Sequence, residues 1–166
     1  MKNLILIRHA KSSWDNPDWT DFERPLNKRG LRDAPFMAEI LKNKGKKPDL
    51  LISSPAKRAI ETAIFFAKEF NYPEEKIIKD IGIYDRGNKY ITNLLSNLKQ
   101  EQSTVFLFGH NPDITSLSSY FSGEYFDNVP TCGIVSIIFK FNDWKNITFE
   151  NGSLEFFEYP KNYFKN

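Results

Sequence analysis

Residues 4–9 of the chain read LILIRH, a run of four apolar side chains that stops at Arg8 and His9. A short, uninterrupted apolar run predicts a strand that is buried on both faces of a parallel sheet. Open α/β sheets bind their ligands at the carboxyl ends of such strands. We therefore expect this strand to place a guanidinium and an imidazole at a ligand-binding site. This pair of side chains suits an anionic substrate.

Two further apolar runs end in the same way. Residues 50–58 read LLISSPAKR, which places Arg58 in the first turn of an expected helix, and residues 106–112 read FLFGHNP, which places His110 at a strand end.

Helical spacing of apolar residues predicts helices near 27–45, 55–70, 91–98 and 112–120. The remaining predicted strands are 49–53, 76–81, 104–108, 134–141 and 153–159, with loops at 12–26 and 82–88.

Local signals refine the first two helices. Asn27 is a plausible N-cap, Gly45 ends the first helix, and Pro35 is expected to weaken its early turns or to move its start. In the second helix, Ser54 is expected to act as the cap, with Pro55 at the first helical position.

Strand and helix alternate, and this alternation predicts a three-layer α/β/α domain with a mostly parallel sheet and an antiparallel edge. The length of 166 residues fits a single domain, 1–166. No glycine-rich phosphate loop is present, so phosphate would have to be bound by side chains.

Composition excludes several classes of protein. With 23 basic and 21 acidic residues the net charge is +2, which argues against a nucleic-acid binder. The single cysteine, Cys132, suits a reducing compartment. No apolar run approaches a signal peptide or the ~20 residues of a membrane span. We expect a cytoplasmic protein without nucleic-acid or membrane partners.

The three strand ends together resemble the histidine phosphatase superfamily, the phosphoglycerate mutase-like proteins. The short bacterial branch, the SixA-type phosphohistidine phosphatases, is closer: its pattern of Asp, Arg-Pro-Leu and Gly matches Asp21, Arg24-Pro25-Leu26 and Gly30. The likeness covers about residues 3 to 140 and implies a phosphoglycerate mutase-like fold.

The resemblance implies a role for each strand-end residue. His9 would be the nucleophile, attacking phosphorus through Nε2 while Nδ1 bonds to a backbone carbonyl that fixes the tautomer. Arg8 and Arg58 would bind the phosphoryl oxygens. His110, as an imidazolium, would donate to a non-bridging oxygen. No metal or other cofactor is needed in this scheme.

Other residues carry open alternatives. Asp85 is the nearest candidate for a general acid. Ser13 and Arg24 are candidates for substrate binding, although Arg24 could instead tie the loop to Asp21. Asp15 stands where the mutase branch has asparagine, and it is expected to turn away from bound phosphate because it would repel it.

The strand-end residues also have purely structural interpretations. Arg58 could form an ion pair with Glu61 or Asp85, with Glu61 serving as its orienting partner. His110 could merely cap the helix that follows it. Ala10 stands where the broader family has glycine, and a methyl group is tolerated there if φ is negative.

The leading hypothesis is a metal-independent phosphatase that works through a phosphohistidine intermediate. Phosphohistidine on proteins is the favoured substrate, since no lid insertion is visible and an open site admits a side chain of another protein. The alternatives are a phosphatase of small phosphate esters and a phosphate-binding protein without turnover. A mutase is less expected, because it must protect its phosphoenzyme from water.

Overall fold

The run LILI forms the middle of β1 (Lys2–Arg8), an interior strand in which all four of its side chains are fully buried. The computed structural model describes residues 1–164. The other strands are β2 (Leu50–Ser53), β3 (Ile78–Lys79), β4 (Thr104–Gly109), β5 (Ile134–Phe139) and β6 (Gly152–Glu158). The helices are α1 (Lys28–Asn43), α2 (Lys57–Glu69), α3 (Gly82–Asp85), α4 (Gly87–Ser96) and α5 (Asp113–Ser122), with short 3-10 helices at Asp21–Glu23, Glu74–Lys76, Trp144–Asn146 and Pro160–Asn162.

The six strands form one sheet in the order β3-β2-β4-β1-β5-β6. β3, β2, β4 and β1 are parallel, whereas β5 runs antiparallel to β1 and β6 antiparallel to β5. The predicted mixed sheet, mostly parallel with an antiparallel edge, is confirmed.

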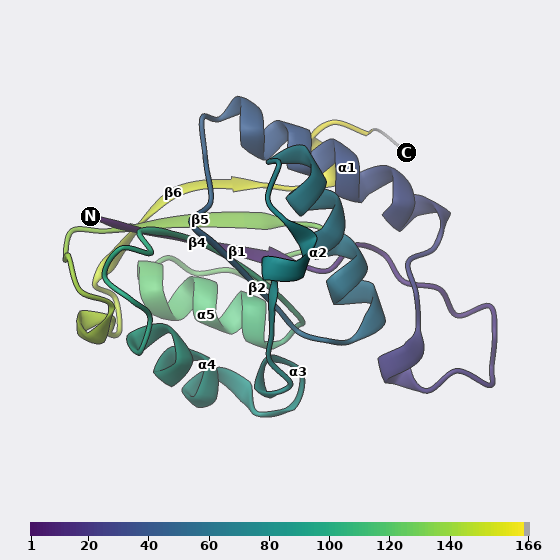
Figure 1. The fold of residues 1–166 in the computed structure, drawn as a ribbon, viewed down its shortest axis with the longest axis horizontal. Coiled ribbons are helices and arrows are strands. Elements are labelled where there is room, and N and C mark those ends of the chain that lie inside the picture. Colours follow the sequence, from purple (N-terminus) through teal and green to yellow (C-terminus); the bar gives the residue numbers. More distant parts are fainter. Residues whose placement is uncertain (165–166) are drawn as a thin grey trace.

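Helices cover both faces of the sheet (Figure 1): α1 lies above it and α2 crosses in front of its right part in this view, whereas α4 and α5 lie below it. Side chains of β1 alternate between the two layers, as the two-residue period of a strand requires. Leu4 and Leu6 belong to the apolar cluster of α4 and α5, and Ile5 and Ile7 to that of α1 and α2. The three-layer architecture is thereby confirmed. No helix within residues 1–164 has the length and apolar character to cross a membrane.

The stretch between α2 and α4 was predicted incorrectly. The expected strand 76–81 is reduced to β3, and the expected loop 82–88 contains α3 and the start of α4. The cause is local capping: the Asp80 side chain accepts hydrogen bonds from the Gly82 N–H at 2.8 Å and from the Tyr90 hydroxyl. These bonds turn the chain into a helix directly after the strand.

Two details at helix starts also differ from the predictions. α2 begins at Lys57 with Ala56 as N-cap, so Ser54 and Pro55 lie before the helix rather than at its first positions. α1 begins directly after Asn27, which is confirmed as its N-cap because its side chain accepts from the Gly30 N–H, but Pro35 does not move the helix start and the helix continues through it. The carbonyl that Pro35 leaves without a hydrogen bond belongs to Leu31, which lies on the exposed side of the helix.

The loop 12–26 closes at its base against α1. Ser12 pairs with Leu26 in an isolated antiparallel bridge, and the Asn27 N–H donates to the Lys11 carbonyl at 3.0 Å. Gly30 lies directly beneath this carbonyl: a Cβ at residue 30 would stand 2.2 Å from the Lys11 oxygen. Glycine is therefore needed at residue 30 for close approach of two backbone segments.

We expect Gly30→Ala to destabilise the protein by about 1–3 kcal/mol, as overpacking does. Helix propensity alone predicts the opposite sign, a gain of about 1 kcal/mol for alanine inside a helix. Gly45→Ala is the control: nothing lies within 4 Å of its added Cβ, but its φ of +80° strains alanine. Urea unfolding should rank Gly30→Ala as the less stable variant, and a Gly30→Ala variant as stable as wild type would refute the close contact.

Candidate active site

Parallel pairing of β1 with β4 brings the two histidines of the chain together. The pairing aligns Arg8 with Gly109, and the His9 N–H continues the ladder by donating to the Gly109 carbonyl at 3.0 Å. His9 and His110 thus follow neighbouring strand ends, with ring centroids 5.1 Å apart and each residue only 7% exposed.

His9 is held in one tautomer. Its Nδ1 lies 2.7 Å from the Ala10 carbonyl oxygen, an acceptor only, so Nδ1 carries the proton and Nε2 has a free lone pair. Burial lowers the pKa of His9 well below its usual value; the hydrogen bond to Ala10 opposes this shift, and the nearby guanidiniums reinforce it. His9 is therefore neutral near pH 7, the state that a nitrogen nucleophile requires.

His110 faces His9 from the next strand and is fixed by Ser54. Its Nε2 lies 2.8 Å from the Ser54 hydroxyl oxygen, which also accepts from the Ala56 N–H. The ring does not cap α5; the helix instead uses the His110 carbonyl, which accepts from Ile114. Burial, followed by the charge of Arg58, lowers the pKa of His110 to about 3. The expected imidazolium is thus corrected to a neutral ring in the free protein.

Arg58, in the first turn of α2, is 6% exposed. Its Nη1 donates to the Asp21 carbonyl at 2.7 Å, its Nη2 donates to Asp21 Oδ2 at 3.0 Å, and its Nε lies 3.4 Å from His9 Nε2. The ion-pair partner is thus Asp21, and the predicted partners Glu61 and Asp85 were wrong. Glu61 instead accepts from the Leu26 N–H and ties the loop to α2.

Asp21 joins three side chains that surround the histidines. Besides Arg58, it accepts from the Tyr84 hydroxyl at 2.8 Å and from Arg24 Nη2 at 3.1 Å. Burial by itself raises the pKa of Asp21, but the hydrogen bonds from these partners outweigh it and lower the pKa to about 2. The carboxylate consequently stays ionised near pH 7 and holds Arg58 in place.

Arg24 forms the predicted tie between the loop and Asp21. Its Nη1 donates to Ser12 Oγ at 2.6 Å, and its guanidinium lies 3.6 Å from the centre of the exposed Trp14 ring. Ser13 is buried, and its hydroxyl oxygen accepts from the Asp15 N–H, while the Asp15 side chain itself is exposed as expected. A substrate-binding role for Ser13 or Arg24 stays a prediction.

Among the site arginines Arg8, Arg24 and Arg58, Arg8 forms the fewest hydrogen bonds with the described residues. Its Nη1 donates to the Val129 carbonyl at 3.1 Å, but its Nε is buried without a hydrogen-bond partner among the described residues. The Nδ1 of His110 is likewise buried and has no hydrogen-bond partner among the described residues. Burial and the neighbouring Arg58 lower the pKa of Arg8, although a guanidinium stays charged at any working pH. Two buried donors or acceptors without partners indicate a site prepared for a polar ligand.

The short helix α3 directs Tyr84, rather than Asp85, towards the histidines. The Tyr84 ring meets the His110 ring edge-on at 5.3 Å, whereas Asp85 is exposed and, within residues 1–164, forms no hydrogen bond or ion pair with the other predicted site residues. Sequence reasoning missed Tyr84, Ser54 and the bridging role of Asp21. The family-like pattern of Asp21 followed by Arg24-Pro25-Leu26 had already indicated Asp21. No pattern in the sequence indicated that Tyr84 would lie in the site.

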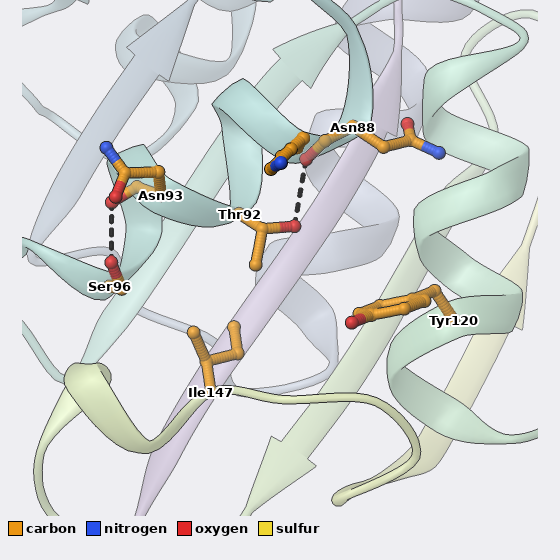
Figure 2. Close-up of a pocket in the computed structure, with 7 residues that line it drawn as sticks. Asn88, Thr92, Asn93, Ser96, Tyr120 and Ile147 are labelled. Atoms are coloured by element: carbon orange, nitrogen blue, oxygen red, sulfur yellow. Dashed lines mark hydrogen bonds between the residues drawn. The ribbon is translucent and has the colours of Figure 1, made fainter.

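A separate pocket of about 640 Å³ lies between α4, α5 and the segment around Ile147 (Figure 2). Thr92 and Ser96 donate back to carbonyls of their own helix, and Lys89 is the one charged side chain in the lining. The pocket therefore lacks the cluster of arginines and histidines found at the strand ends.

No group of three or more His, Cys, Asp or Glu side chains within residues 1–164 is placed to hold a metal ion.

Comparisons with known proteins agree with this geometry. The model of the Histidine phosphatase superfamily (branch 1) matches residues 4–86. An uncharacterised chloroplast protein of Arabidopsis thaliana is 30% identical over 152 residues, which are 87% of this chain and 69% of that protein. Phosphoglycerate mutase 1 of Saccharomyces cerevisiae is 37% identical over 67 residues, but the match covers only 38% of this chain and 26% of the mutase.

The fold also matches a solved structure over nearly the whole chain. The crystal structure of a protein assigned as the phosphohistidine phosphatase SixA of Agrobacterium tumefaciens superposes with a TM-score of 0.80 at 25% identity. The match covers 96% of this chain and 98% of that protein. The phosphoglycerate mutase-like fold that the sequence predicted is therefore confirmed.

The chain has two histidines, and both lie in the candidate site, so histidine NMR signals report on this site alone. We expect neither ring to titrate between pH 5 and 8, because burial favours the neutral form of both. Ring ¹⁵N shifts recorded across this range test the expectation, and urea-unfolded protein, in which both rings should titrate near pH 6.5, is the control. A folded-state midpoint near 6.5 for either ring would contradict it.

Proposed function

The chain belongs to the histidine phosphatase superfamily, in its SixA-type branch, and is a phosphatase; we propose that it hydrolyses phosphohistidine on proteins through a phosphorylated His9. The observation that carries this proposal is the pairing of a neutral His9, whose Nε2 carries no proton, with the cations Arg8 and Arg58. A binding protein would need the cations but not the nucleophile.

Charge complementarity supports a phosphoryl substrate. Arg8, Arg24 and Arg58 are cations, and Asp21 is the carboxylate that pairs with two of them. A phosphoryl group brings about −1.5 to −2 charges at neutral pH. Its oxygens would accept from the guanidiniums of Arg8 and Arg58, and Arg8 Nε, which has no partner within residues 1–164, would gain one.

In the first step, His9 Nε2 attacks phosphorus in line as the bond from phosphorus to the substrate imidazole breaks. Arg58 Nε, which lies 3.4 Å from His9 Nε2 in the free protein, turns to a phosphoryl oxygen and uncovers the attacking lone pair. The departing imidazole takes a proton from water. The Nδ1–H of His9 donates to the Ala10 carbonyl throughout, so the ring that carries the phosphoryl group needs no rearrangement.

In the second step, water attacks the phosphorus on His9, the bond to Nε2 breaks, and inorganic phosphate leaves. His110 donates a hydrogen bond to a non-bridging oxygen in both steps, with Ser54 holding the ring in position. Because His110 is neutral in the free protein, its contribution is a directed N–H rather than a full charge.

The acid chemistry of the site favours phosphohistidine over alkyl phosphates. An alkoxide leaving group needs a proton from a general acid, an effect worth about 10²–10⁴-fold. Asp21 is the carboxyl group that contacts the catalytic arginine, and its pKa of about 2 leaves it without a proton near pH 7. An imidazole leaving group can be protonated from solvent and dispenses with this acid.

The two histidines form a matched pair of variants for testing the nucleophile. We expect His9→Ala to abolish turnover and to trap no phosphoenzyme, whereas His110→Ala should still accept the phosphoryl group, about 10²–10³-fold more slowly, as expected for loss of a donor to the transition state. Acid quench with ³²P-labelled substrate measures an acid-labile, base-stable label. A label retained in His9→Ala and lost in His110→Ala would reverse the two assignments.

The role of Asp85 as a general acid can be tested with substrates that differ in their leaving group. Because its side chain is exposed and α3 directs Tyr84 to the site instead, we expect Asp85→Asn to change kcat/KM for an alkyl phosphate, p-nitrophenyl phosphate and phosphohistidine by less than about threefold each. If Asp85 is the general acid, hydrolysis of the alkyl phosphate alone should fall by about 10²–10⁴-fold. That selective loss would restore Asp85 to the catalytic residues and make small esters the favoured substrates.

A further inference from the structure

A second, smaller pocket of about 330 Å³ adjoins the candidate active site. It lies between the Asp21–Glu23 turn and the start of α2, and its lining is Trp19, Phe22, Glu23, Pro55, Lys57 and Ile60. Its volume is at the lower end of the range for ligand pockets, which suits a single side chain better than a cofactor.

The lining is built from chain neighbours of the site residues. Phe22 follows Asp21, and Lys57 precedes Arg58, so these pairs have Cα atoms only about 3.8 Å apart. Pro55 likewise follows Ser54, which binds His110. Three lining residues of the pocket are thus direct chain neighbours of site residues.

Phe22 connects the two sites directly. Its ring meets the Tyr84 ring edge-on at 5.2 Å, and Tyr84 meets the His110 ring at 5.3 Å. Phe22 is nevertheless 36% exposed, so part of its surface remains available to a ligand. An aromatic side chain left partly exposed beside a reaction centre is typical of an anchor point for a partner.

The chemistry of the lining indicates what fits. Trp19, Phe22, Pro55 and Ile60 supply apolar surface, while Glu23 and Lys57 are exposed at the edge. The Glu23 carboxylate is already engaged by the Thr20 N–H and hydroxyl. An apolar centre with a polar edge matches an apolar side chain on a protein surface rather than a second anion.

We propose that this pocket is a specificity subsite that receives an apolar side chain of the substrate protein, within about three residues of its phosphohistidine. The inference rests on the proposed function. Three extended residues span on the order of 10 Å, and the lining residues Phe22 and Lys57 have Cα atoms about 3.8 Å from those of Asp21 and Arg58. The subsite would let the enzyme choose among phosphohistidine proteins by the residues that flank the modified histidine.

Two synthetic phosphohistidine peptides test the subsite. They differ only in whether leucine or serine occupies the three positions on each side of the phosphohistidine. We expect wild type to hydrolyse the leucine peptide with a kcat/KM about tenfold higher, which corresponds to about 1.4 kcal/mol. Trp19→Ala should abolish this preference by lowering kcat/KM for the leucine peptide, while p-nitrophenyl phosphate, which has no flanking residues, is hydrolysed within about twofold of the wild-type rate.

Two further variants serve as an independent test of the pocket and as a control. Ile60→Ala removes apolar lining from α2 and should reduce the preference without involving the loop. Phe149→Ala is the matched control, since Phe149 is a 57% exposed aromatic whose ring packs on Tyr120, outside this pocket. Its preference for the leucine peptide should equal that of wild type.

The outcomes separate this inference from the proposed function. Equal hydrolysis of both peptides by wild type, or a preference that survives in both Trp19→Ala and Ile60→Ala, would overturn the subsite and leave the phosphohistidine phosphatase intact. Hydrolysis of p-nitrophenyl phosphate without hydrolysis of either peptide would overturn both.

Discussion

The parallel ladder between β1 and β4 is the constraint on which the rest of the structure depends. It aligns Arg8 with Gly109, and one further hydrogen bond, from the His9 N–H to the Gly109 carbonyl, holds the two histidines side by side. A shift of register by one residue would turn the buried side chains of β1 to the opposite faces of the sheet, so packing on both faces fixes the pairing. The packing of the core therefore also fixes the placement of the two histidines.

Burial then sets the chemistry of the site. Both imidazoles are nearly inaccessible to water, and the resulting desolvation keeps them neutral, so His9 retains its lone pair. The arginines stay charged because a guanidinium does not lose its proton in proteins. One carboxylate, Asp21, orients Arg58 without cancelling the positive charge of the site, since Arg8 has no acidic partner within residues 1–164.

The loop 12–26 has two functions in this scheme. Its base is fixed to α1 by the close approach of Gly30 to Lys11, and its far turn supplies Asp21 to Arg58. The same turn exposes Phe22 and builds one wall of the proposed subsite. A change in this turn would therefore affect the orientation of Arg58 and the choice of substrate together.

The sequence by itself determined five of the six strands, the three-layer architecture and the residues at the strand ends, because buried strands and helix faces leave periodic apolar patterns that do not depend on distant contacts. Only the tertiary structure decided that Asp21 pairs with Arg58, that Ser54 holds His110 instead of capping α2, and that α3 presents Tyr84 where Asp85 was expected. These contacts join residues up to 56 positions apart. The protonation state of His110 likewise depends on burial, which the assembled fold alone creates.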